Sequence, residues 1–429
     1  MTQKRTYSGI AAEALENAAN IQHFMSNSPW SGRGVIEQVQ REVSALWRNE
    51  TGRVLILDES ADAKAGLASA GSGRQHNGRL GKEDVCQVGV FLALACGGLW
   101  TWIDGELFMP AAWFTAEALP RRQRIGMPEK RTFQTKVQLG WQMIERAQAA
   151  NVPFDWLACD DLYGRANWFR AKLAAAQIVY VADVPSTTRV YLQRPTWGTP
   201  AAKKRKKQPR RPRVLSPEKP LPVREVALRA DTVWQTVRVR ATERGELQAS
   251  YAVRQVWTLR DERPTQEWLV VRREADGELR YAFNNAPADT SRLRLAQMEA
   301  GRAFVECSIR DAKSELGWDE FQALKYCAWE HQLALTILAS WFITETRWEW
   351  RQQCPPDVAL MAELGVDSLP GLSMANVREL LRATLPLRQL SIAEAQALVC
   401  AHLLNRTRSR RSRLKKQYDL LRFHSRDPA

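Results

Sequence analysis

The sequence contains no long apolar run, and this absence excludes a class of proteins at the start. No segment approaches the roughly 20 consecutive apolar residues that a membrane-spanning helix needs. The first 20 residues also lack the apolar core of a signal peptide. We therefore expect a cytoplasmic protein with no membrane partner.

Cysteine and histidine occur without any metal-binding or cross-linking pattern. The seven cysteines stand singly, with no C-x-x-C pair, and there are five histidines in 429 residues. An odd number of isolated cysteines argues against a disulfide framework, and these ligands argue against structural zinc. Any bound metal is therefore expected on carboxylates, which suit a hard cation such as Mg²⁺ or Mn²⁺.

A phosphate-binding glycine motif is also missing. Residues 66–82 (GLASAGSGRQHNGRLGK) are rich in glycine, but their spacing is neither that of a P-loop nor that of a dinucleotide fingerprint. We therefore exclude a nucleotide cofactor. The segment has little apolar content, which predicts a long exposed loop with basic side chains.

Basic residues, in contrast, are in excess. The chain has 62 Lys and Arg against 47 Asp and Glu, a formal charge of +15. A surplus of this size points first to a polyanionic partner. Residues 201–213 hold eight basic residues and no acid, and residues 406–416 hold seven. We expect both runs to be exposed and to contact DNA without reading its sequence, although such runs also occur simply as solubilising segments.

Short apolar segments that end in an acid recur along the first half of the chain. Residues 54–57 are continuously apolar and stop at Asp58, and residues 154–159 end in the same way at Asp160. Continuous apolarity predicts strands buried on both faces, with the acid held at the rim of the sheet. Taken alone, each acid is more often the start of a loop, where it caps the next turn.

The order of these elements predicts the fold. The strand before Asp58 is followed by a hairpin over residues 85–108, a helix within 126–150, the strand before Asp160, a helix over 167–176 and a strand over 177–184. This is the ribonuclease H-like order, in which the first and fourth strands are neighbours. We therefore expect an α/β fold whose mixed sheet is flanked by helices and brings Asp58 close to Asp160.

A third acid follows a β-rich insertion. Residues 224–240, 247–260, 268–273 and 279–283 read as strands separated by turn residues. Residues 301–313 then form an amphipathic helix in which Arg302, Glu306, Arg310 and Lys313 recur at helical spacing. From these thirteen residues alone, a solvated face with ordinary Glu/Arg pairs is the commoner outcome. Three acids on rigid elements are, however, a set that binds two divalent cations.

Composition shifts divide the chain into five regions, and with 429 residues two or three domains are expected. We expect a helical N-terminal region (1–50), the first part of the catalytic domain (51–185), a β-rich insertion with the basic loop (186–288), the second part of the catalytic domain (289–350), and a helical C-terminal region with a basic tail (351–429).

The motifs resemble those of the DDE transposases of bacterial insertion sequences. Arg302, Glu306 and Lys313 match the last three members of the Y-R-E-K signature at its full spacing. Asp58-Glu59-Ser60 is similar to the family's D-x-T/S, and Asp160 with Tyr163 and Gly164 is similar to D-x-x-Y-G. Glu299 stands where the signature has tyrosine, and Ala303 follows the arginine where the family usually has tryptophan.

The resemblance implies a catalytic, metal-binding triad of Asp58, Asp160 and Glu306 that holds two Mg²⁺ or Mn²⁺ ions. It implies that the protein nicks DNA at the ends of a transposable element and transfers the freed 3′-hydroxyl to target DNA. It also implies a homodimer on the paired transposon ends and association with the bacterial nucleoid. Arg302 and Lys313 would contact phosphates near the cleaved end. The other candidate DNA contacts are Arg310, Arg74, Lys82, Lys203, Lys204, Arg205, Lys206, Lys207 and Trp268.

Two alternatives to this function remain open from the sequence. A catalytically degenerate or domesticated relative would act only as a DNA-binding protein, and another ribonuclease H-like nuclease, such as a resolvase, would share the fold. The resemblance also implies a tryptophan in the insertion that stacks on a flipped DNA base. The candidates are Trp234, Trp257 and Trp268, and core packing is the simpler explanation for each.

Overall fold

The computed structural model describes residues 6–354, 358–365 and 371–384, apart from 14–15, 79, 201–210, 243–244, 261–262, 275 and 321–323, together with short pieces between 391 and 415. The basic residues Lys203, Lys204, Arg205, Lys206 and Lys207 lie outside the described residues, and the run 406–416 is described only in part.

Three helices precede the sheet: α1 (Tyr7–Glu13), α2 (Ala18–Ser26) and α3 (Gly32–Leu46). The hydroxyl of Ser31 caps α3 by accepting the Gly34 N–H. Ile36, Val39 and Val43 recur at helical spacing and are buried. They attach α3 to the central sheet and to a long C-terminal helix.

Ten strands of the described chain form one mixed sheet, in the order β11-β12-β13-β14-β6-β5-β1-β3-β2, with β4 paired to β3. The strands nearest the predicted acids are β1 (Val54–Ala63), β5 (Trp156–Cys159) and β6 (Tyr180–Asp183). These three run parallel, and β5 and β6 end at one edge of the sheet. β1 does not stop at Asp58, as its apolar run predicts, but continues along β3 to Ala63. Leu57 pairs with Cys159, which places Asp58 and Asp160 side by side at that edge. The expected α/β, ribonuclease H-like sheet flanked by helices is confirmed.

The predicted hairpin is also present. β3 (Lys82–Cys96) and β4 (Leu99–Phe108) are joined by Gly97 and Gly98, both with positive φ, as a tight hairpin turn requires. The expectation of a long loop over residues 66–82 is wrong in part, because β2 (Gly73–Asn77) pairs with β3. As an edge strand, β2 exposes Arg74 and His76 to solvent and needs little apolar sequence.

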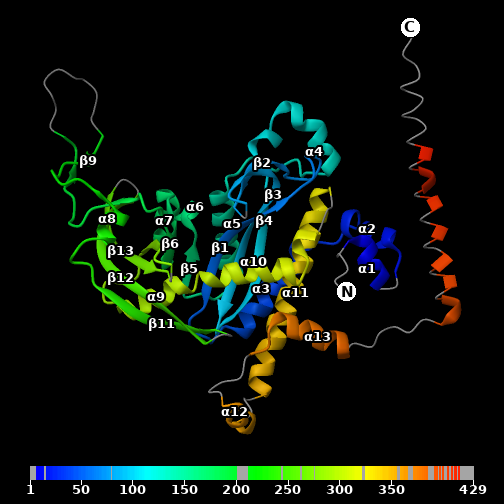
Figure 1. The fold of residues 1–429 in the computed structure, drawn as a ribbon. Coiled ribbons are helices and arrows are strands. Elements are labelled where there is room, and N and C mark those ends of the chain that lie inside the picture. Colours follow the sequence, from blue (N-terminus) through cyan, green and yellow to red (C-terminus); the bar gives the residue numbers. More distant parts are fainter. Residues whose placement is uncertain are drawn as a thin grey trace.

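The insertion strands continue the same sheet. β11 (Trp234–Thr242), β12 (Gly245–Arg260), β13 (Arg263–Arg273) and β14 (Leu279–Asn284) pair antiparallel in succession, and β14 then pairs with β6. Figure 1 shows these strands, in green, extending the central sheet to the left. The strand expected from residue 224 is wrong at its start, because α8 (Val223–Ala227) buries Val223 and Val226 at helical spacing.

The two faces of β1 pack against different helices. Leu55 and Leu57 belong to the core on the side of α5 (Lys136–Ala149), whereas Val54 and Ile56 pack with Met298 and Val305. The latter two come from α9 (Arg292–Ala300) and α10 (Ala303–Ser314), and Figure 1 shows α10 lying across the front of the sheet. Since side chains alternate along a strand, Asp58 faces the α10 side.

A 28-residue helix, α11 (Tyr326–Gln353), packs on α3 and β4. Among the helices of the described residues, α11 included, none combines the length and the apolarity that crossing a membrane requires. The remaining elements are short: α4 (Leu119–Ile125), α6 (Asp161–Gly164), α7 (Asn167–Ala175), α12 (Val358–Leu364), α13 (Met374–Thr384), β7 (Arg189–Val190), β8 (Trp197–Gly198), β9 (Arg213–Val214), β10 (Leu221–Pro222) and three 3₁₀ turns.

Candidate active site at the carboxyl edge of the sheet

Asp160 is held by the turn that follows β5. Its Oδ1 accepts the backbone N–H groups of Leu162 at 3.0 Å and Tyr163 at 3.5 Å, so it caps the one-turn helix α6. A Cβ on Gly164 would lie 1.9 Å from the Asp183 carbonyl oxygen. Only glycine therefore allows the turn to pack against the end of β6, which gives a physical reason for this residue in the D-x-x-Y-G pattern.

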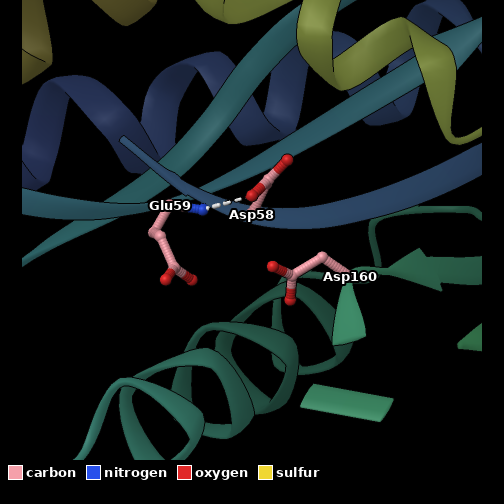
Figure 2. A group of neighbouring side chains, drawn as sticks. All are labelled: Asp58, Glu59 and Asp160. Atoms are coloured by element: carbon pink, nitrogen blue, oxygen red, sulfur yellow. Dashed lines mark hydrogen bonds between the residues drawn. The ribbon is translucent and has the colours of Figure 1, made fainter. Parts of the chain in front are cut away.

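Three carboxylates converge at this edge. One side-chain oxygen from each of Asp58, Glu59 and Asp160 lies within 4.8 Å of the others. Figure 2 shows the three side chains together, with the Glu59 N–H donating to Asp58 Oδ1 at 2.7 Å. Each is largely buried. The sequence predicts two members of this group, and Glu59 is the one it missed.

Glu59 was missed because neighbouring residues of a strand normally point to opposite faces. Its Oε1 lies 2.9 Å from the Nζ of Lys136, the first residue of α5, which covers the face opposite to α10. Its Oε2 is buried and lacks a hydrogen bond of normal geometry in the described part of the chain. Both carboxylates reach Asp160 because β5 ends there and leaves the space beside β1 open.

The cluster is short of positive charge. Burial raises the pKa of Asp58 to about 7, an effect that the nearby Arg302 guanidinium partly opposes. Burial also raises the pKa of Asp160 to about 8, and the negative charges of Asp58 and Glu59 add to the increase. Desolvation and like charge both disfavour the ionised form. A divalent cation at this point would supply the missing positive charge.

Glu306 lies outside this three-carboxylate group. It sits in the first turn of α10, its side chain is 65% exposed, and its Oε1 is 3.0 Å from Arg302 Nη1. Glu306 lies on α10, which packs on the face of β1 that carries Asp58, and its negative charge adds to the raised pKa of Asp58. The structure thus brings Asp58 and Asp160 together and places Glu306 at the solvent side of the same edge.

Arg302 links the acids of this edge. Its Nε lies 3.0 Å from Asp183 Oδ2, and its side chain is 17% exposed. Asp183 is the last residue of β6. Like Asp58 and Asp160 it follows a short apolar run, and this pattern in the sequence marks it as a third acid of the same kind. Arg302 was expected to contact DNA phosphates; in the structure its contacts are with Asp183 and Glu306.

The other predicted residues of α10 differ in their exposure. Lys313 is 14% exposed, and its Nζ contacts Asp62 Oδ1 at 3.1 Å and the Ala61 carbonyl at 3.2 Å. Arg310 is 68% exposed and lies 3.5 Å from Asp311. Lys313 therefore points toward β1, whereas Arg310 is open to a partner.

Glu299 occupies the place of the signature tyrosine, and it is buried at the end of α9. It accepts hydrogen bonds from the Tyr251 hydroxyl at 2.9 Å and from Arg272 Nη1 at 3.2 Å, and both donors come from the insertion. Burial raises the pKa of Glu299 to about 7. A phenol is thus still present beside this position, although it is supplied by β12.

The remaining predicted DNA contacts lie away from the cluster. Arg74 and Lys82 are exposed on the β2–β3 hairpin. Trp268 is partly buried on β13, where its indole N–H donates to the Pro287 carbonyl at 3.3 Å and its ring borders a cavity of about 450 Å³. Trp234 and Trp257 lie under the guanidinium groups of Arg273 and Arg194, at 3.9 Å and 5.4 Å.

Comparisons with known proteins bear on the family of this chain. The family model of the DDE superfamily endonucleases matches residues 1–246, which include Asp58 and Asp160. A probable transposase for insertion sequence element IS701 from Microchaete diplosiphon is 24% identical over 327 residues, 73% of this chain and 70% of that protein. The solved structure of a piggyBac transposase synaptic complex with hairpin DNA aligns with 81% of this chain at 10% identity and a TM-score of 0.34; the chain spans 56% of that protein's length. The chain therefore belongs to the DDE superfamily of endonucleases and is an insertion-sequence DDE transposase.

Proposed function

We propose that this transposase cleaves DNA at the ends of its element and joins the freed 3′-hydroxyl to target DNA, with Asp58, Asp160 and Glu306 as its metal-binding residues. The observation that carries the proposal is the group of largely buried carboxylates within 4.8 Å of one another, where β5 ends beside β1. Glu306 on α10 faces the same edge and is open to solvent and hence to DNA.

The donor set fits a hard divalent cation. All the ligands on offer are carboxylate oxygens, which suit Mg²⁺ or Mn²⁺. The buried Glu59 Oε2 makes no hydrogen bond of normal geometry among the described residues, and the raised pKa values of Asp58 and Asp160 mark a site that needs positive charge. When bound, two such ions would activate the attacking oxygen and neutralise charge on the phosphodiester.

The protein's own residues supply placement. Asp58 and Asp160 are fixed by the parallel pairing of β1 with β5, and Lys136 holds one oxygen of Glu59. Arg302, anchored by Asp183, holds Glu306 at the mouth of the site. Glu306, once released from Arg302, would complete the metal-binding set, and the guanidinium would then be available to a DNA phosphate.

DNA binding in this proposal rests on charge. The formal charge of +15 and the two basic runs supply phosphate contacts that hold the duplex without reading its sequence. We further propose that two copies bind paired element ends as a homodimer in the nucleoid.

The direct test is cleavage and joining of an element-end duplex by purified protein in Mg²⁺. Asp160→Asn and Glu306→Gln are each expected to lose at least about 100-fold in rate, because each removes a metal ligand. Asp161→Asn is the matched control, since Asp161 is 43% exposed and paired with Arg165. Cleavage by Asp160→Asn at the parent's rate would refute the assignment.

Glu59 requires a separate variant. If its free oxygen helps to hold the metal, Glu59→Gln weakens Mg²⁺ binding about 10-fold, measured by titration calorimetry. Lys136→Gln removes a competing cation and should leave binding at least as tight. Equal weakening by both variants would show that the ion pair, rather than the free oxygen, matters.

A further inference from the structure

We propose that Arg170 and Glu267 are positioning residues for Asp160: a buried ion pair that ties insertion strand β13 to the turn carrying this carboxylate. The proposal rests on the proposed function insofar as Asp160 is a metal ligand. It assigns a role to two residues that lie outside the carboxylate cluster and that no sequence motif marks.

Glu267 is surrounded by donors in the interior of the extended sheet. The residue is 3% exposed, and its carboxylate accepts hydrogen bonds from the hydroxyls of Tyr180 on β6 and Thr258 on β12. Arg170 Nε lies 3.5 Å from Glu267 Oε1. This one carboxylate therefore joins two insertion strands to β6 and to α7.

Arg170 extends the connection toward Asp160. The residue is 2% exposed; its Nη1 donates to the Gly164 carbonyl, and its Nη2 donates to Asn167 Oδ1 at 3.1 Å. Its guanidinium also lies 5.1 Å from the Phe283 ring centroid on β14. One planar side chain thus contacts the insertion and the last residue of α6 at the same time.

The turn with Asp160 depends on such outside support. α6 has four residues, and a single helical turn is not stable by itself because nucleation is unfavourable. Its closing bond runs from the Gly164 N–H to the Asp160 carbonyl at 2.9 Å. Arg170 therefore holds the carbonyl of the same residue, Gly164, whose N–H closes the turn on Asp160.

Stability alone is a weak reason for this pair. Burying two charges costs free energy of desolvation that their attraction often does not repay, and apolar residues of similar volume frequently serve as well. The planar guanidinium of Arg170, however, holds Gly164 and Asn167 through two hydrogen bonds of fixed geometry and faces the Glu267 carboxylate with its charge, which apolar packing does not do. The geometry points to placement: the insertion sheet and the Asp160 turn are held as one unit.

The test uses the full-length protein and two readouts, hydrogen exchange of residues 160–166 and Mg²⁺ affinity by calorimetry. Glu267→Gln keeps the shape of the side chain and removes its charge. We expect exchange in 160–166 to become at least about 10-fold faster and Mg²⁺ to bind about 10-fold more weakly, as for other outer residues of metal sites. Arg170→Lys keeps the positive charge but cannot bond the Gly164 carbonyl and Asn167 at the same time, so it should show the same two effects to a smaller extent. This variant replaces Glu267→Gln in the test if Glu267→Gln does not fold.

Asp104→Asn is the matched control. Asp104 is likewise fully buried between two arginines, Arg33 at 2.6 Å and Arg146 at 2.8 Å, but it makes no contact with α6 or α7 in the described residues. It should lower the melting temperature and leave both readouts unchanged. If Glu267→Gln and Arg170→Lys only lower the melting temperature in the same way, the proposal is overturned. If the parent binds no Mg²⁺, the proposed function fails, while the exchange measurement still decides this inference.

Discussion

The carboxylates of Asp58 and Asp160 are largely buried at the candidate active site, where water screens their negative charge poorly. Their side chains lie beside Glu59 at an edge where the nearest guanidinium, Arg302, also pairs with Asp183 and Glu306. Such a group of acids stabilises a bound cation and destabilises the empty fold. The pKa values of about 7 for Asp58 and about 8 for Asp160 express this cost.

This cost predicts a pH dependence of the metal-free protein. Since the pKa of Asp58 is higher in the folded chain than the ordinary value of 3.8, the folded state binds more protons between about pH 4 and pH 7, and stability falls as pH rises through that window. In EDTA at pH 8, Asp58→Asn should therefore melt above the parent, and at pH 4 the two should nearly coincide. Mg²⁺ should raise the melting temperature of the parent far more than that of the variant.

Thermal unfolding followed by circular dichroism measures these differences. Asp161→Asn controls for the loss of one negative charge at an exposed position of the same turn. A metal-free Asp58→Asn variant that melts below the parent at pH 8 would contradict the account, because the carboxylate would then be stabilising in its ionised form.

At the scale of elements, α10 is fastened to the sheet at both ends. Arg302, just before its first residue, pairs with Asp183 of β6, and Lys313 near its end pairs with Asp62 of β1. At about 100° per residue, Arg302 and Lys313 lie on nearly the same line along the helix, and Arg310 lies about 80° away. The shared spacing thus predicts one face only coarsely, and Arg310 turns to solvent.

Breaking the second of these contacts should cost stability. Lys313→Met leaves Asp62, which is 8% exposed in its side chain, with only the weaker influence of Lys64 to offset its charge. We expect a loss of about 2 to 3 kcal/mol in the free energy of unfolding, measured in urea. The double variant Asp62→Asn/Lys313→Met should recover part of it, because no buried charge is then left unpaired.

The same variant examines the phosphate contact expected of Lys313. If Lys313 also reaches a DNA phosphate, the slope of log affinity against log salt should decrease by about one. If the salt slope is unchanged while stability is lost, Lys313 serves only to hold α10 against β1 and does not contact DNA phosphate. An unchanged stability would mean that the pair with Asp62 contributes nothing.

On the scale of the whole molecule, a single sheet runs through both the catalytic region and the β-rich insertion, which the sequence analysis separates by composition. The insertion strands pair from β11 through β14 and join the catalytic strands at β6. Without β14, β6 would be an edge strand with unpaired backbone groups, so the pairing also protects that edge. Displacement of the insertion by bound DNA would therefore act directly on the strands that carry the acids.

The excess of basic residues should govern DNA affinity at this scale. Replacing Lys203, Lys204, Arg205, Lys206 and Lys207 with serine should weaken binding to any duplex and reduce the salt slope by about four to five if all five contact phosphates. Fluorescence anisotropy with an element end and an unrelated duplex of equal length measures both effects. A salt slope equal to that of the parent would refute the contact, and a loss confined to the element end would refute its lack of sequence preference.

Much of the architecture follows from local sequence. Three features depend on residues close together in the chain: the apolar runs of four residues before Asp58 and Asp160, the glycine pair at residues 97–98, and the helical spacing of residues 301–313. Their order is enough to predict the mixed sheet and the pairing of β1 with β5. The same motifs also indicate the family to which the chain belongs.

Tertiary structure alone decided which charges meet. Glu59 joins Asp160 across about a hundred residues, Lys313 meets Asp62 across about two hundred and fifty, and Arg170 meets Glu267 across the insertion. The spacing of apolar residues predicts which face of a helix or strand is buried, but it does not predict which other helix or strand packs on that face. Desolvation and pairing depend on that cover, so the charge balance of the site emerges only when the sheet and its helices assemble.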